Sequence, residues 1–293
     1  MTDANYPPPL DRLLTYGDPG FQQRAEWPDY VAMFQLGPQH IPDLIQMATD
    51  ADLNEADTDS PEVWAPLHAW RALGQMRAEA AIEPLLTLLT TGDEDRFDDS
   101  ILEELPDVYA MIGPAAIPAL SALLGDDSQG IYGRMSALTA LGQIAEQYPD
   151  ARDAALAPIV RQLESYATND EDLNGFRISE LMRLKAVEAL PLMEQVFKVG
   201  QVDPMMATWD DVQIEFGLKT PEEVGRDPER PQADPLRVQR MQQQFGIAPA
   251  APVKPFRPAR TAATGAGGAS SGDKAKAKRK MGKESRKKNK KRK

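Results

Sequence analysis

The sequence predicts an all-α protein, a right-handed α-solenoid of about five helical hairpins followed by an extension of different composition. Three observations lead to this prediction. A glycine followed by an apolar residue and a proline recurs along the chain, the segments around it have helical apolar spacing, and the composition changes after residue 218. Internal repetition with a period of about 20–50 residues is typical of solenoids and arrays.

The recurring unit is clearest at residues 113–124, GPAAIPALSALL, where Leu120, Leu123 and Leu124 have helical spacing. A proline inside a helix costs about 3 kcal/mol. Pro118 instead falls in the first turn of the predicted helix, where backbone donors have no intrahelical partner. The stretch therefore predicts the turn between two antiparallel helices. Similar stretches occupy residues 37–47, 74–89 and 142–163, with a degenerate fifth at 184–197 that has lysine in place of the glycine.

The second unit shows both predicted helices. Ser60 is expected to cap a helix whose first residue is Pro61, and Trp70 follows within its apolar stripe. Gly74 is expected to end this helix in the left-handed conformation. The next helix starts near Ile82. Because neither helix buries its stripe alone, the hairpins are expected to stack around one continuous core.

The segments HAWRALGQMRAEAAIEPLLTLL (68–89) and IGPAAIPALSALL (112–124) resemble HEAT repeats. They are most similar to the short bacterial type that also occurs in phycobilisome-lyase-like proteins. The resemblance covers roughly residues 28–200 and implies the fold. HEAT arrays serve many unrelated roles, so it favours a non-enzymatic protein–protein interaction scaffold or adaptor over any single reaction.

The lyase-like relatives imply an alternative function, a bilin-handling protein or chaperone that would be lyase-like if it is an enzyme. Such a site needs an aromatic-lined cleft with a carboxylate. The candidates for it are Trp64, Trp70, Tyr109, Tyr132 and Asp107, although the spacing of Trp70 favours the core.

Four regions follow from the pattern. Residues 1–27 are an N-terminal capping segment, and residues 28–218 form the solenoid. Thr208 and Asp211 approximate a capping box for a short helix that closes its C-terminal end. Residues 219–272 are a Pro/Ala/Gly-rich linker with a short helix at 235–245, which either docks on the solenoid or recognises a partner. Residues 273–293 are a disordered polybasic tail.

Charge is divided unevenly between these regions. The chain has a net charge of −12, yet residues 273–293 hold 13 Lys or Arg and two acidic residues, which leaves −23 for residues 1–272. Cysteine is absent, no apolar run is long enough to span a membrane, and the N-terminal residues lack signal-peptide features. We expect a cytoplasmic monomer with no membrane contact.

Candidates for chemistry are few. His40 and His68 lack the following glutamate that metal-dependent HEAT-like enzymes such as deoxyhypusine hydroxylase use, so we expect ordinary surface or turn histidines. Residues 50–62 match the first three ligand positions of a calcium loop, but Glu55 and Pro61 occupy its glycine and glutamate positions. A solvated acidic loop is expected there and at residues 92–100. We therefore expect no catalytic residue, no metal site and no cofactor.

Two sets of cations are predicted to contact partners. The tail is expected either to bind RNA, DNA or the ribosome through phosphate neutralisation or to serve only as a solubilising segment. Its cations are Lys274, Lys276, Lys278, Arg279, Lys280, Lys283, Arg286, Lys287, Lys288, Lys290, Lys291, Arg292 and Lys293. The candidates for contact with an unidentified protein on the solenoid surface are Arg77, Arg134, Arg161 and Arg183.

Overall fold

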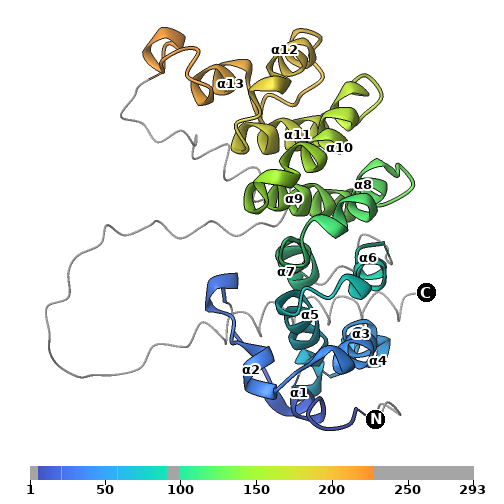
Figure 1. The fold of residues 1–293 in the computed structure, drawn as a ribbon. Helices are drawn as coiled ribbons and strands as arrows, with labels where there is room; N and C mark the ends of the chain where they lie inside the picture. The colour runs from blue at the N-terminus through green and yellow to red at the C-terminus, as the bar shows by residue number, and fades with distance from the viewer. Residues whose placement is uncertain (1–5, 21, 58, 91–98, 227–293) are drawn as a thin grey trace, which may run out of the picture.

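The structure, a computed structural model, describes residues 6–20, 22–57, 59–90 and 99–226. The helix expected at 235–245, the polybasic tail and most of the acidic loop at 92–100 lie outside these residues. Within them the protein is an all-α, HEAT-like solenoid, as the sequence predicts (Figure 1).

Five helical hairpins follow one another along the described chain. They are α2 (Tyr30–Phe34) with α3 (Ile41–Thr49), α5 (Ala65–Gln75) with α6 (Ile82–Thr90), α7 (Asp99–Ile112) with α8 (Ile117–Gly125), α9 (Ile131–Gln147) with α10 (Arg152–Glu164), and α11 (Glu171–Arg183) with α12 (Leu190–Lys198). The short helix α1 (Asp11–Tyr16) precedes them, α4 (Ala51–Asn54) lies between the first two, and α13 (Trp209–Glu215) follows the last. First helices pack on first helices, α5 on α7 and α7 on α9.

Each hairpin turns in the same way, through a single 3₁₀ turn before the second helix. These turns are Pro38–His40, Glu79–Ala81, Pro114–Ala116, Pro149–Ala151 and Val187–Ala189. Pro118 lies in the first turn of α8, as predicted, where its missing N–H leaves no hydrogen bond unmade. Pro106 and Pro158 are different, because they lie inside α7 and α10.

The repeated glycines do not share one structural role, which corrects the expectation for Gly74. Gly113 has a φ of 98° and follows the end of α7, whereas Gly74 lies inside α5. The left-handed residue of that turn is Arg77, with a φ of 50°. A Cβ on Gly74 would stand 3.3 Å from Val108 Cα, so this glycine allows α5 and α7 to pack closely.

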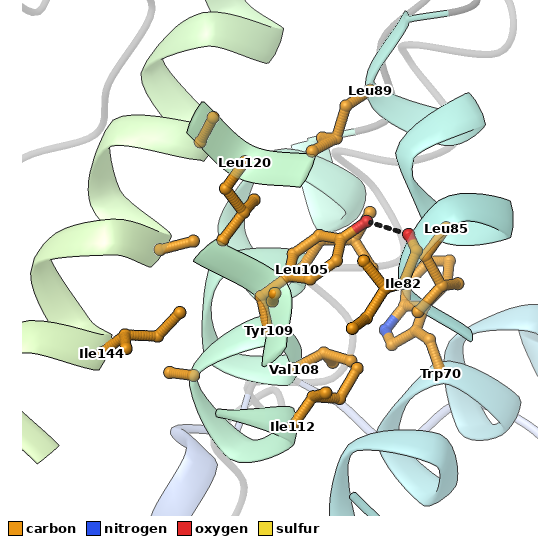
Figure 2. Packing of buried hydrophobic residues seen from close by; sticks show 14 of the residues in the cluster. Trp70, Ile82, Leu85, Leu89, Leu105, Val108, Tyr109, Ile112, Leu120 and Ile144 are labelled. Carbon is orange, nitrogen blue, oxygen red and sulfur yellow. Dashed lines mark hydrogen bonds between the residues drawn. The ribbon is translucent and has the colours of Figure 1, made fainter. Parts of the chain in front are cut away.

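The buried aliphatic and aromatic side chains form one cluster that runs through the stack, and Figure 2 shows part of it. Tyr109 of α7 is fully buried and donates its hydroxyl to the carbonyl oxygen of Ile82, which ties one hairpin to the next. Trp70 lies in the same cluster, so its predicted core position is confirmed.

Both ends of the stack have short helices. At the N-terminal end, α1 packs against α5 and the turn Pro61–Trp64. At the other end, the Thr208 hydroxyl accepts the Asp211 N–H and the Asp211 carboxylate accepts the Thr208 N–H, which is the predicted capping box of α13. None of the described helices is by itself long and apolar enough to cross a membrane; only residues 100–112 and 114–125 reach that length together, and they are bent by 115°.

Candidate functional site

The four predicted contact arginines lie in different environments. Arg77 and Arg161 are exposed, on the turn after α5 and on α10. Arg134 is buried at the start of α9, where Nε donates to the Leu124 carbonyl, so little of it is open to a partner. Arg183, at the end of α11, is exposed and borders a hollow of about 370 Å³ beside α13. Only Arg183 therefore combines exposure with a concave surface.

Two adjoining hollows lie along α11, and we call them together the α11 hollow. One, of about 370 Å³, separates α11 from residues 206–207 and α13; the other, of about 210 Å³, separates α11 from α9. Ser179 and Arg183 line both, which makes the surface continuous. The remaining lining residues are Met135, Leu138, Thr139, Phe176, Glu180, Met182, Met206, Ala207, Asp211 and Glu215.

The apolar part of the lining of the α11 hollow contains three methionines and a phenylalanine. Met135, Met182 and Met206 come from three different segments, and Phe176 adds an aromatic ring. Methionine has an unbranched, polarisable side chain that repacks around different partners, and it is frequent at binding surfaces for that reason. The arrangement suits an apolar side-chain stripe better than a small polar molecule.

Carboxylates dominate the rim. Arg183 is shared between Glu146, at 2.7 Å from Nη1, and Glu180, at 2.7 Å from Nη2. These hydrogen bonds outweigh the desolvation of Arg183 and raise its pKa. Lys185 pairs with Glu215 across the α11–α13 boundary. One cation thus serves two carboxylates at the centre of the rim.

The last described residue anchors the chain to the same rim. Arg226 Nη1 lies 2.5 Å from Asp211 Oδ1, and its Nη2 donates to the Thr208 hydroxyl at 2.9 Å. Burial acts to raise the pKa of Asp211, but hydrogen bonds from Arg226 and Thr208 outweigh it and lower that pKa. The chain therefore enters residues 227–293 directly beside the α11 hollow.

A buried polar network at the N-terminal end escaped the sequence analysis. Arg71 is fully buried in α5 and binds Glu104 of α7 through Nε at 2.8 Å and Nη2 at 2.6 Å. Its guanidinium also lies 4.7 Å from the Trp27 ring centre, and Tyr30 contacts it through the hydroxyl. The network fastens the N-terminal segment to two hairpins. The sequence feature that could have revealed this network is an arginine within the largely apolar run 65–74.

His68 belongs to this network, and the expectation of a surface or turn histidine is wrong for it. The ring is fully buried, with Nδ1 2.9 Å from the Tyr30 hydroxyl and Nε2 2.8 Å from the Gly17 carbonyl. His40 does lie in a turn, where Nδ1 accepts the Gly37 N–H at 2.9 Å. Both rings therefore serve local structure.

Arg177 on α11 is another buried arginine, and its surroundings are the opposite of those of Arg71. It is fully buried, and none of its three guanidinium nitrogens has a hydrogen-bond partner among the described residues. Desolvation, together with the nearby charge of Arg134, lowers its pKa to about 10. At neutral pH it remains a charged group inside the protein.

The remaining candidates have structural positions. Residues 51–54 form α4, with the Asp50 side chain capping it by accepting from Asp52 N and Leu53 N, so the expected acidic loop is partly helical. Across the described ranges, no group of three or more His, Asp or Glu side chains is placed to hold a metal. Of the residues weighed for a bilin site, Trp64, Trp70 and Tyr109 are buried.

Comparison with known proteins agrees with the fold. Residues 69–91 match the family model of the PBS lyase HEAT-like repeat. The matched segment includes most of α5, the turn after it and all of α6. No curated protein and no solved structure matches the chain.

Proposed function

We propose that this HEAT-repeat protein is a non-enzymatic interaction scaffold, which binds a protein partner in the α11 hollow and is tethered to a polyanion by its C-terminal tail. HEAT-like repeats generally mediate protein interactions, and the fold and the family match support such a role for this chain. The observation that carries the proposal is the α11 hollow itself, whose lining holds three methionines together with the carboxylates Glu180, Asp211 and Glu215.

The chemistry of the hollow supports one kind of partner. An apolar stripe on a helix would pack on the methionines of the lining, and basic residues beside that stripe would meet Glu146 and Glu180. Helix-in-groove recognition of this kind uses apolar anchors three or four residues apart. The proposed partner is therefore a protein that presents a basic amphipathic helix.

A rim substitution tests the protein-binding part. Thr139 is exposed on α9 at the edge of the hollow, so Thr139→Arg places a long cation there without disturbing the core. Proteins captured by the full chain and by this variant are compared by quantitative mass spectrometry, with Ala122→Arg on α8 as the matched control at an exposed site. We expect a partner whose capture falls at least about tenfold in Thr139→Arg alone, equal to about 1.4 kcal/mol. Equal capture by both variants would contradict the assignment of the surface.

The tail requires a separate experiment. Thirteen cations in residues 273–293 can each neutralise a phosphate, so binding to RNA or DNA should weaken steeply as salt increases. The full chain is compared with a chain ending at Gly272 over a salt series. We expect affinity and salt dependence to be lost with the tail. If both chains bind alike, or neither binds, the tether proposal fails.

A further inference from the structure

We propose that residues 235–245 of this same chain dock as a short helix in the α11 hollow, so that the protein covers its own partner surface. The sequence there reads PLRVQRMQQQF. The segment lies outside the described residues, and the inference rests on its sequence, on the hollow and on the place where the described chain ends. It depends on the proposed function only for its consequence, competition with a partner.

The segment has the chemistry that the hollow selects. In a helix, Val238, Met241 and Phe245 recur at i, i+3 and i+7 and form one apolar stripe. Arg237 lies beside that stripe, and residues 235–245 contain no acidic residue. An apolar stripe flanked by a cation matches a hollow whose lining holds both methionines and carboxylates.

The described chain ends beside the α11 hollow. Arg226 is held on α13 by Asp211, which itself lines the hollow. Eight residues, 227–234, separate it from the segment, and an extended chain of that length spans up to about 26 Å. An 11-residue helix is about 16 Å long. The segment can therefore reach the hollow without any rearrangement of the stack.

Because the segment is tethered beside the hollow, even a weak contact is sufficient for it to occupy the hollow. A short flexible linker gives an effective concentration in the millimolar range, so a contact with a dissociation constant of about 1 mM is already half formed within the chain. A free partner at micromolar concentration would then need an affinity well above that of the segment to displace it. The docked segment sets a threshold for partner binding.

The absence of cysteine makes a direct test simple. Thr139→Cys on α9 and Gln243→Cys, which faces away from the apolar stripe, give two unique sites for nitroxide labels in the full chain. Pulsed electron–electron double resonance then measures the distance between the two nitroxide labels. Docking predicts a narrow distance distribution, whereas an undocked segment gives a broad one.

Two further substitutions in the segment separate the effect of a charge in the apolar stripe from the effect of the same charge elsewhere in the segment. Met241→Asp puts a charge in the stripe and should remove the narrow component, while Gln239→Asp puts the same charge on the opposite side and should keep it. Neither changes a residue of the solenoid. The same broad distribution in the labelled parent and in both variants would overturn the proposal.

A mixture of two singly labelled chains tests whether the segment that fills the hollow comes instead from a second copy of the chain. A narrow distance between chains that strengthens with concentration would overturn docking within one chain. Because these measurements need no partner, a failure to capture any protein would contradict the proposed function and leave the docking result standing.

Discussion

Replacing Arg177 with methionine is expected to stabilise the protein. The guanidinium is fully buried, has no hydrogen-bond partner in the described part of the chain, and lies near a second cation, Arg134. Removing an unpaired buried charge relieves its desolvation, and methionine retains most of the alkyl stem that packs in the core.

The magnitude follows from the lowered pKa. Its pKa, lowered from the ordinary arginine value to about 10, means that the folded protein disfavours the charged form of Arg177. At about 1.4 kcal/mol for each pKa unit, this penalty is roughly 3 kcal/mol. The shorter methionine side chain leaves a cavity, which costs about 1 kcal/mol and offsets part of the gain from removing the charge. We expect Arg177→Met to raise the free energy of unfolding by about 1–3 kcal/mol.

The dependence on pH has a defined sign. Because the folded pKa of Arg177 is depressed, the unfolded chain binds this proton more tightly, and the penalty is complete below about pH 10. This penalty disappears as the pH rises from about 10 toward the ordinary pKa of arginine. The stability difference between the wild type and Arg177→Met should therefore be constant near neutral pH and narrow above pH 10.

Urea unfolding at neutral pH, followed by circular dichroism, measures the effect. Arg161→Met is the matched control, because it makes the same change in charge and composition at an exposed site on α10. It should shift stability by no more than about 0.5 kcal/mol. A loss of stability in Arg177→Met beyond that of the control would refute the reasoning, since it would mean that the guanidinium is favourably bound.

The other predictions concern the stack. Arg71→Met should cost about 3–5 kcal/mol, because it leaves the Glu104 carboxylate without its bidentate partner; a loss under 1 kcal/mol in urea unfolding would contradict this. Gly133→Ala should cost about 1–3 kcal/mol, since its Cβ would overlap the backbone carbonyl of Leu89 and force α6 from α9. Gly142→Ala, on the same helix, should be nearly neutral: its Cβ meets flexible side-chain ends, and alanine gains about 1 kcal/mol in helix propensity. Equal thermal shifts for the two glycine variants would show that backbone contact is not the cause.

The fold could be predicted because its determinants are local. The proline position in the first turn of α8 and the capping box at Thr208 depend on residues at most four apart, and both are found. Gly74 shows the limit of the same reasoning. A glycine near a helix end has two physical uses, a left-handed cap or a close helix contact, and the choice depends on Val108 in the next hairpin.

The polar sites could not be predicted because their partners are distant in sequence. Arg71 and Glu104 are 33 residues apart, and the Tyr30 hydroxyl meets His68 across 38 residues. Composition alone does not separate a paired buried arginine from an unpaired one such as Arg177. Each required the packing of neighbouring hairpins before its environment was defined.

The α11 hollow itself arises from the way the array ends. Inside the stack, a first helix such as α7 packs on first helices to both sides, α5 and α9. Beyond the fifth hairpin, formed by α11 and α12, the next helix is α13, with 7 residues against the 13 of α11. A helix of that length leaves part of α11 uncovered. The terminal unit of a solenoid needs either a polar outer face or a partner that covers such a surface. The residues that line the hollow are therefore those that the repeat pattern does not constrain, which explains why periodicity identified the scaffold but not its binding surface.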